Sequence, residues 1–252
     1  MSITISKKIK DLVRAIGCRI GLINSNDVYY NQDGLFTCHN CDFMRDPRFL
    51  EAYQRGVKAC EVDYKFHWRV HVALWAASYA VNLPGAFVEC GVNRGFLSSA
   101  IMQYLRWNDL NKQFFLFDTF SGLDESLINE EEIALGRLKF TRERYSECYE
   151  KVKENFAEFH NVTLVRGSIP STLVQVEINS VCFLSIDMNC AAPEIAAANF
   201  FWPKMVQHGV ILLDDYAYKG YRPQKIAFDC FAAEKKVQIF SLPTGQGLII
   251  KP

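Results

Sequence analysis

Two groups of residues in this sequence have types and spacings suited to chemistry. The first is the stretch Val88-Glu89-Cys90-Gly91-Val92-Asn93-Arg94-Gly95, in which an acid precedes a turn of the form G-x-N-x-G. The second is a set of carboxylates that end apolar runs: Asp187, Asp214 and Asp215. A glycine turn that opens a helix suits a nucleotide-like ligand, whereas grouped carboxylates suit a hard divalent cation or acid–base catalysis.

The first group has the pattern of a strand, a turn and a helix. Ala86–Cys90 is a short apolar run bounded by Pro84-Gly85 and by later glycines, which predicts a buried strand. Phe96–Leu105 has apolar residues at helical spacing and no breaker. This order presents backbone N–H groups and a helix N-terminus to a ligand.

The spacing of the turn indicates which ligand it suits. A dinucleotide fingerprint requires G-x-G-x-x-G, but the chain has Asn93 between Gly91 and Gly95. With Glu89 before it, the turn suits a positively charged nucleoside without phosphates better than a pyrophosphate. S-adenosylmethionine (SAM) is such a ligand. A plain βα turn without a ligand is the alternative.

Two later strand ends extend this interpretation. The expected strand 113–119 contains Asp118, which follows Gly95 by 23 residues, where such folds place an acid for the ribose hydroxyls. A helix cap or turn cap is the alternative for Asp118. The expected strand 162–168 ends in Gly167 and Ser168, small residues that suit an adenine contact.

The elements that must position these residues alternate along the chain. Strands are expected at 86–90, 113–119, 162–168, 181–187 and 209–215, and helices at 96–105, 141–159, 193–207 and 223–235. This alternation predicts an α/β fold with a mostly parallel sheet and helices on both faces. Residues 237–242 and 247–250 are too close for a crossover helix, so they predict a C-terminal antiparallel hairpin.

Residues 1–83 are expected to form an N-terminal helical lid, ahead of a nucleotide-binding domain at 84–252. Residues 5–19 are amphipathic and basic, which predicts a cap or dimer helix, with contact to anionic lipid as the alternative. Asn24–Cys41 has the composition of an irregular loop. Helices are expected at Arg48–Ala59 and Tyr64–Val81. The helix Tyr64–Val81 leads into the strand expected at 86–90, so both helices are placed to cover the open end of that strand.

Composition narrows the function classes. The 28 basic and 28 acidic residues balance, so there is no basic excess of the kind that nucleic-acid partners require. Nine scattered cysteines are not a disulfide framework and favour a cytoplasmic protein. No run reaches transmembrane length. Cys38 with Cys41 lacks a second ligand pair for zinc, and His67 with His71 is better explained as a packed helix face than as a metal pair.

Assembled, these pieces resemble the class I SAM-dependent methyltransferases, and among them the macrocin O-methyltransferase (TylF/MycF-like) family. The resemblance runs from Tyr64 to the end of the chain. It is carried by V-E-C-G-V-N-R-G (Val88–Gly95), F-D-T-F-S-G-L (Phe117–Leu123), L-S-I-D (Leu184–Asp187) and V-I-L-L-D-D-Y (Val210–Tyr216). It implies a Rossmann-like class I methyltransferase sheet and a homodimer.

The resemblance also implies a site. Residues expected to bind SAM are Glu89, Gly91, Asn93, Gly95, Ser98, Asp118, Gly167 and Ser168. Asp187, Asp214 and Asp215 are expected to hold Mg²⁺ or another divalent cation, and Asp187 is our choice for the catalytic base. The expected reaction is methyl transfer to a hydroxyl of a sugar or other small, typically glycosylated, secondary metabolite.

One departure from the family keeps rival functions open. The family's strand-four motif commonly reads D-G-D-L-Y, but here it is Asp187-Met188-Asn189-Cys190-Ala191, so the second acid is an amide. The rivals are a metal-independent methyltransferase, in which Asp214 and Asp215 are caps, and a catalytically silent SAM-binding scaffold. An NAD-dependent oxidoreductase is disfavoured by the missing middle glycine and the terminal hairpin.

Overall fold

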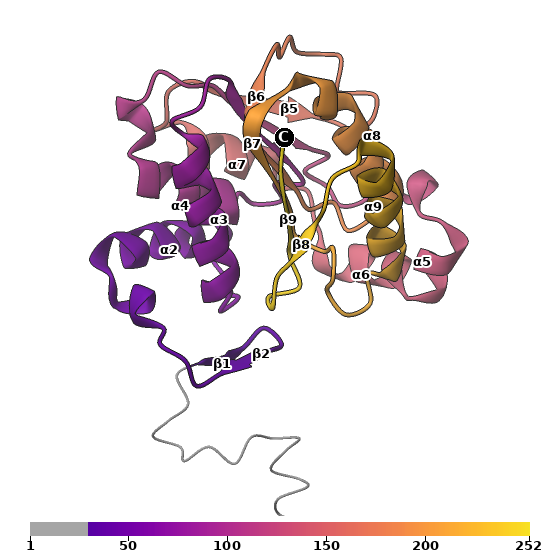
Figure 1. The fold of residues 1–252 in the computed structure, drawn as a ribbon, viewed down its shortest axis with the longest axis horizontal. Helices are drawn as coiled ribbons and strands as arrows, with labels where there is room; N and C mark the ends of the chain where they lie inside the picture. Colours follow the sequence, from indigo (N-terminus) through magenta and orange to yellow (C-terminus); the bar gives the residue numbers. More distant parts are fainter. Residues whose placement is uncertain (1–29) are drawn as a thin grey trace, which may run out of the picture. The chain divides into compact units, whose positions relative to one another are not determined.

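The computed structural model describes residues 30–252 (Figure 1), which divide into two units: residues 30–42 belong to the first, and residues 43–252 form the second. In the described part of the first unit, β1 (Tyr30–Gln32) and β2 (Leu35–Thr37) form an antiparallel hairpin. Its turn residues Asp33 and Gly34 have φ of 53° and 72°, as two-residue hairpin turns require. The predicted irregular loop is therefore wrong for residues 30–37. The amphipathic helix expected within residues 5–19 lies outside the described residues.

The larger unit is built on a seven-stranded sheet of order β5-β4-β3-β6-β7-β9-β8. Five strands are parallel: β3 (Ala86–Cys90), β4 (Phe114–Asp118), β5 (Val162–Arg166), β6 (Val181–Ile186) and β7 (Met205–Leu213). β9 (Gly247–Ile250) runs antiparallel to both β7 and β8 (Phe240–Ser241). The predicted Rossmann-like sheet with a C-terminal antiparallel hairpin is confirmed.

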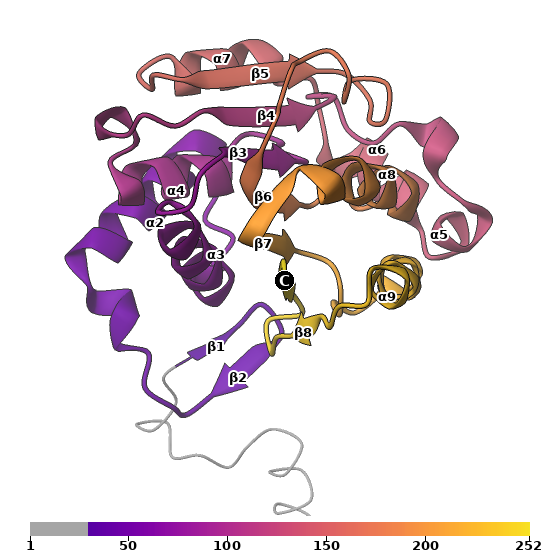
Figure 2. The ribbon, with the colours of Figure 1, turned by 45° about the horizontal axis from the view of Figure 1, so that its top comes forward.

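Helices cover both faces of this sheet (Figure 2). One face carries α2 (Pro47–Cys60), α3 (His67–Ala80), α4 (Phe96–Leu105) and α7 (Tyr149–Phe156), and the other carries α8 (Ala191–Phe201) and α9 (Arg222–Lys235). Alternate residues of β3 serve the two cores, since Phe87 packs with the first set of helices and Val88 with the second. Within residues 30–252, no helix is long and apolar enough to cross a membrane.

Aromatic rings fill the first of these cores. Phe87 is fully buried, and its ring centroid lies 5.3 Å from Trp107, 5.6 Å from Phe114 and 4.9 Å from Phe183. These three partners come from the short helix η2 (Trp107–Asp109) and from two neighbouring strands. The cluster therefore fixes β3 against both of its neighbours, and with it the turn that follows.

Local signals explain where the first helices begin. Asp46 caps α2 by accepting a hydrogen bond from the Phe49 N–H at 2.9 Å, and Pro47 occupies the first turn. The predicted helix at 48–59 is thus confirmed to within one residue at each end. α3 begins at His67, three residues later than predicted, and ends as predicted near Val81.

The predicted long helix at 141–159 is wrong. The chain instead forms α6 (Arg137–Arg144), a break, and then α7. Tyr145 is extended (φ −107°, ψ 143°), and the Cys148 N–H donates to the Phe120 carbonyl at 2.8 Å. Contacts with distant residues therefore replace helix hydrogen bonds at the break.

Three further boundaries differ from the prediction. The acidic segment, expected to be a loop, contains the 3-10 turn η3 (Glu125–Leu127) and the short helix α5 (Glu130–Ala134). α8 ends at Phe201 and is followed by η4 (Trp202–Lys204), so the helix expected to reach residue 207 is too long. Strand β7 accordingly begins at Met205 rather than at residue 209.

The aromatic cluster gives a stability prediction. We expect Phe87→Ala to lower the free energy of unfolding by about 3–5 kcal/mol, because it removes a large buried ring and leaves a cavity. Val174→Ala is the matched control, since Val174 is 78% exposed and its truncation should change stability by less than about 0.5 kcal/mol. Denaturant unfolding measures both variants. Equal effects would show that the cluster does not hold β3.

Candidate active site

A cavity of about 540 Å³ lies at the carboxyl edge of the parallel strands. The strand order reverses between β3 and β6, and open α/β sheets bind ligands at such a point. The cavity is lined by most of the predicted site residues, namely Glu89, Gly91, Asn93, Asp118, Gly167, Ser168, Asp187, Asp214 and Asp215. Gly95 and Ser98 are not part of this lining. The roles of all these residues remain predictions.

The turn after β3 owes its shape to left-handed backbone. Gly91, Asn93 and Gly95 have φ of 94°, 49° and 84°, which explains why the turn has these residues at every second position. At Gly91 an added Cβ would lie 1.7 Å from the Asp187 carbonyl oxygen. The backbone of the turn thus packs directly against the end of β6.

Asp118 supports the turn from β4. Its Oδ2 accepts hydrogen bonds from the Val92 and Asn93 N–H groups, both at 2.7 Å. Its Oδ1 accepts from the Phe120 N–H at 2.6 Å. These three hydrogen bonds are those of a turn cap, the alternative role given for Asp118. The contact of Asp118 with the ribose stays a prediction.

Glu89 is a buried acid with spare bonding capacity. It is 3% exposed, and its Oε2 has no hydrogen-bond partner in the described part of the chain. Burial, with smaller contributions from Asp118 and Asp214, raises the pKa of Glu89 to about 8, although the neighbouring Ser98 hydroxyl opposes the shift. A cationic ligand at this end of the cavity would favour the ionised carboxylate.

Three carboxylates gather at the ends of β6 and β7. Asp187, Asp214 and Asp215 each offer one oxygen within 4.8 Å of the others. Burial and mutual repulsion raise the pKa of Asp187 and Asp215 well above the usual range of an aspartate. Neutral acids or a nearby positive charge must therefore balance this cluster.

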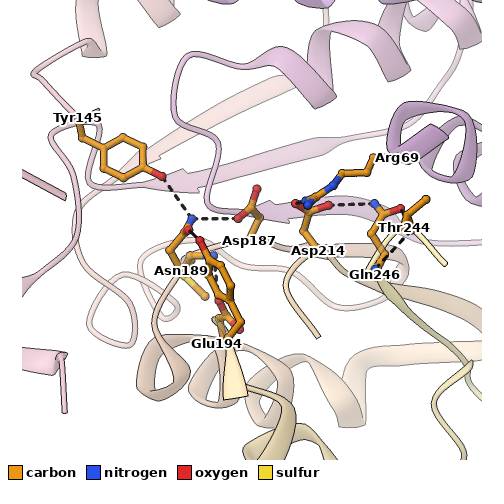
Figure 3. A network of polar contacts seen from close by, with 10 residues as sticks. Arg69, Tyr145, Asp187, Asn189, Glu194, Asp214, Thr244 and Gln246 are labelled. Atoms are coloured by element: carbon orange, nitrogen blue, oxygen red, sulfur yellow. Dashed lines mark hydrogen bonds and ion pairs between the residues drawn. The ribbon is translucent and has the colours of Figure 1, made fainter. Parts of the chain in front are cut away.

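Part of that balance comes from α3 (Figure 3). The buried guanidinium of Arg69 forms an ion pair with Oδ2 of Asp214. The Gln246 side chain donates to Oδ1 of Asp214 at 2.9 Å and is itself held by Thr244 at 2.9 Å. Asp214 thus joins α3, β7 and the C-terminal hairpin.

Asn189 is bonded to Asp187 (Figure 3). Its Nδ2 donates to Oδ1 of Asp187 at 3.1 Å and lies 3.3 Å from the Tyr145 hydroxyl. Its Oδ1 accepts a short hydrogen bond from the Tyr221 hydroxyl. The amide therefore orients the Asp187 carboxylate, whereas a second acid at this position would place a like charge beside it.

The loop that carries Asn189 is anchored by two buried glutamates. Glu194 accepts from the Met188 N–H at 3.2 Å. Glu132, which is fully buried, accepts from the Ala191 N–H at 2.8 Å and also closes the capping box of α5 with Asn129. Glu132 thereby ties the segment that follows β4 to the start of α8.

The residues present fit a divalent cation. Carboxylate oxygens are hard ligands that Mg²⁺ prefers, and Oδ2 of Asp215 is buried without a hydrogen-bond partner among residues 30–252. Arg69 and Gln246 each engage one oxygen of Asp214, but a carboxylate oxygen has a second lone pair for a metal. The three aspartates form the only such ligand group in the described part of the chain.

Several residues of the site are not identified by the sequence patterns. Arg69 lies in the helix expected at Tyr64–Val81, but its ion pair with Asp214, 145 residues further along the chain, is not predicted. Its position as a cation on the buried side of an apolar helix is the available signal. Tyr145 and Tyr221 give no signal. The packing interpretation of the histidines is confirmed, since His67 stacks on Tyr53 at 4.2 Å and His71 on Phe43 at 4.0 Å.

Comparison with known proteins identifies the family. The sequence model of the macrocin-O-methyltransferase (TylF) family matches residues 72–240. The chain belongs to this family. Membership makes it a SAM-dependent O-methyltransferase by class and confirms the resemblance seen in the motifs. No curated protein matches the sequence.

Solved structures share the fold of this TylF-family chain. The O-methyltransferase NovP is 19% identical, with 73% of this chain and 79% of that chain covered and a TM-score of 0.64. The calicheamicin methyltransferase CalS11 is 15% identical, with 81% and 93% covered and a TM-score of 0.55. Its apo form, described as a TDP-rhamnose 3'-O-methyltransferase, is 12% identical over 98% and 96% of the chains, with a TM-score of 0.51.

The contact between Gly91 and β6 can be tested by substitution. We expect Gly91→Ala to destabilise the protein by at least about 2 kcal/mol, because the methyl group would overlap the Asp187 carbonyl. Gly136→Ala is the control: it also has positive φ (86°) but has nothing within 4 Å of the added Cβ, so it should cost only about 1–2 kcal/mol of backbone strain. Thermal and denaturant unfolding give both values, and equal losses would contradict the steric explanation.

The raised pKa of Glu89 gives a pH prediction. Between pH 4.5 and about 8 the folded protein holds a proton on Glu89 that the unfolded chain has released. Stability of the ligand-free protein should therefore fall as pH rises through this window, by up to about 1.4 kcal/mol per pH unit from this group. Glu89→Gln should remove that part of the slope. Denaturant unfolding across the window measures it, and the same slope in both proteins would refute the assignment.

Proposed function

We propose that this protein transfers the methyl group of SAM to a hydroxyl of a sugar or other small secondary metabolite, with help from a divalent cation. The observation that supports this most is the cluster of Asp187, Asp214 and Asp215 within 4.8 Å, in the same cavity as the glycine turn after β3. One region of the cavity suits a cationic nucleoside, and the other suits chemistry on an oxygen.

Residues of β3, β4 and β5 are proposed to hold the cofactor. Bound SAM would supply the methyl group from its sulfonium. The unpartnered Oε2 of Glu89 suits its positively charged amino group or the turn beside it. The left-handed turn at Gly91 and Asn93 allows close approach of the ligand, while Gly167 and Ser168 line the cavity below the end of β5. Ser98 would act through its neighbour Glu89.

Asp187 is the proposed base. A sugar hydroxyl is a weak nucleophile at neutral pH, so a positioned acceptor for its proton speeds transfer. The raised pKa of Asp187, which is due to burial and to Asp214 and Asp215, makes this carboxyl a stronger base than an exposed aspartate. The Asn189 amide holds one oxygen of Asp187, which leaves the other for the acceptor.

Asp187, Asp214 and Asp215 would hold the divalent cation. When bound, Mg²⁺ would polarise the acceptor hydroxyl and lower its pKa. It would also offset the repulsion within the cluster. CalS11, which shares the fold, is described as a TDP-rhamnose 3'-O-methyltransferase, and this description supports a sugar-type acceptor here.

A metal-independent methyltransferase is the second candidate. The Arg69 guanidinium, already paired with Asp214, favours it, because this cation offsets one carboxylate without a metal. In that case Asp187 would accept the proton and Asp214 would be a structural partner of Arg69. Membership of an O-methyltransferase family speaks against the third alternative, a catalytically silent scaffold. The predicted homodimer, the cytoplasmic location and the boundary between 1–83 and 84–252 stay predictions.

Turnover separates these candidates. Transfer of a labelled methyl group to a panel of hydroxylated acceptors is expected in Mg²⁺, with loss in EDTA and recovery when Mg²⁺ returns. Asp187→Asn should lower kcat by about 10²–10⁴, because it removes the base, yet leave SAM affinity nearly unchanged. Calorimetry with SAM checks the second part.

Asp109→Asn is the control, since Asp109 is exposed in η2 and is not part of the cavity lining. It should keep full activity. Full turnover in EDTA would exclude the metal and support the second candidate. No turnover with any acceptor, despite SAM binding, would support the scaffold.

A further inference from the structure

Arg137 is a feature of the cavity wall that the proposed reaction does not explain. It is the first residue of α6, and it is only 6% exposed. Its Nη2 donates a long hydrogen bond to the Gly220 carbonyl at 3.4 Å, and its Nε is buried without a partner among residues 30–252. A guanidinium has five N–H donors, and a buried cation is costly unless an anion and hydrogen bonds complete it.

Neighbouring cations on the same segments do have anionic partners. The ion pairs are Lys139–Glu143, Arg142–Glu125 and Arg222–Glu131, all formed by exposed side chains. Besides Arg69, the cations that line the cavity are Arg137, Arg144 and Lys219. In the described part of the chain none of these three forms an ion pair, in contrast to Arg69, which is paired with Asp214.

Contacts place Arg137 on the acceptor side of the cavity. Its guanidinium lies 4.0 Å from the centroid of the Tyr221 ring and 5.6 Å from that of Phe140. Tyr221 in turn donates to Asn189, which donates to the proposed base Asp187. A guanidinium that stacks on a ring keeps its N–H edge for a ligand. This edge is therefore linked to the proposed base Asp187 through Tyr221 and Asn189.

Asp215 does not form an ion pair with the Arg137 guanidinium. The two groups attract each other electrostatically, but no ion pair joins them. Asp215 instead faces Asp187 and Asp214, with which it forms the carboxylate cluster. Donors of Arg137 thus remain for a group that enters the cavity.

We infer that Arg137, with Arg144 and Lys219, binds an anionic oxygen group of the acceptor, a carboxylate or a phosphate. The acceptor is then an acidic hydroxylated molecule, such as a uronic acid or a sugar phosphate, rather than a neutral glycoside. Carboxylates and phosphates match the fork of N–H donors that a guanidinium presents. The inference rests on the proposed function, because it assigns this side of the cavity to the acceptor.

Calorimetry with three probes tests it without turnover. D-glucuronate, α-D-glucose 1-phosphate and methyl α-D-glucopyranoside are titrated in EDTA into the full chain, with and without S-adenosylhomocysteine. At least one anionic probe is expected to bind tenfold or more tightly than the neutral glycoside. The probe that gains affinity distinguishes a carboxylate from a phosphate. Arg137→Gln should reduce the gain to less than threefold, and Arg137→Lys should keep part of it.

Lys139→Gln is the matched control, because Lys139 lies in the same helix but is exposed and paired with Glu143. It should bind all three probes like the unmodified protein. If Arg137→Gln does not fold, the double variant Arg144→Gln with Lys219→Gln changes exposed residues only and should lower the anionic gain about two- to fivefold. Equal affinity for all three probes, or a gain that survives both sets of substitutions, would overturn the inference.

The outcome is separate from that of the proposed function. A protein that prefers the anionic probes but transfers no methyl group would contradict the proposed reaction and retain the anion site. A protein that methylates neutral acceptors but binds the anionic probes no more tightly would support the proposed reaction and contradict the anion site.

Discussion

Repulsion among three carboxylates, one buried and two half-buried, is the constraint on which this site depends. Asp187, Asp214 and Asp215 offer oxygens within 4.8 Å of one another at the end of the sheet. Water cannot screen such charges inside a cavity as it does at a surface, so each extra negative charge raises the free energy steeply. Protons, a cation or a guanidinium must be present for the fold to be stable. The source of this positive charge also sets the pKa of Asp187, the proposed base.

The chain meets this constraint with parts that are distant in sequence. Arg69 comes from a helix that precedes the sheet, and Gln246 comes from the hairpin that ends it. Both engage Asp214, so the ion pair and the hydrogen bond join α3 to the end of β7 and to the C-terminal hairpin of the same sheet. Asn189 serves Asp187 in a different way, because an amide donates a hydrogen bond without adding charge. The replacement of an acid by Asn at this position is therefore consistent with a cluster that already has excess negative charge.

The sheet was predictable because its signals are local, and the site was predictable only in part. Short apolar runs that end in Glu89, Asp118 or Asp187 mark the strands and the edge at which they end. The break at Tyr145 was not predictable, since no Gly or Pro marks it in the sequence and the contacts that hold it come from distant residues such as Phe120 and Asn189. A contact between residues more than a hundred positions apart, such as Arg69 with Asp214, cannot be predicted from the spacing of residues in a motif.

The anchoring of the segment after β4 bears on how such enzymes change their substrates. This segment lines the cavity proposed to hold the acceptor, so it is a candidate for exchange when a new acceptor is wanted. Glu132 belongs to that segment, and its carboxylate accepts a hydrogen bond from the N–H of Ala191, the first residue of α8. Ala191 lies two residues after Asn189 in the sequence. A transplanted segment without an acid at this position would leave a buried backbone N–H unpaired. The loop beside Asp187 would then lose its support, so acceptor choice and catalytic geometry would have to be redesigned together.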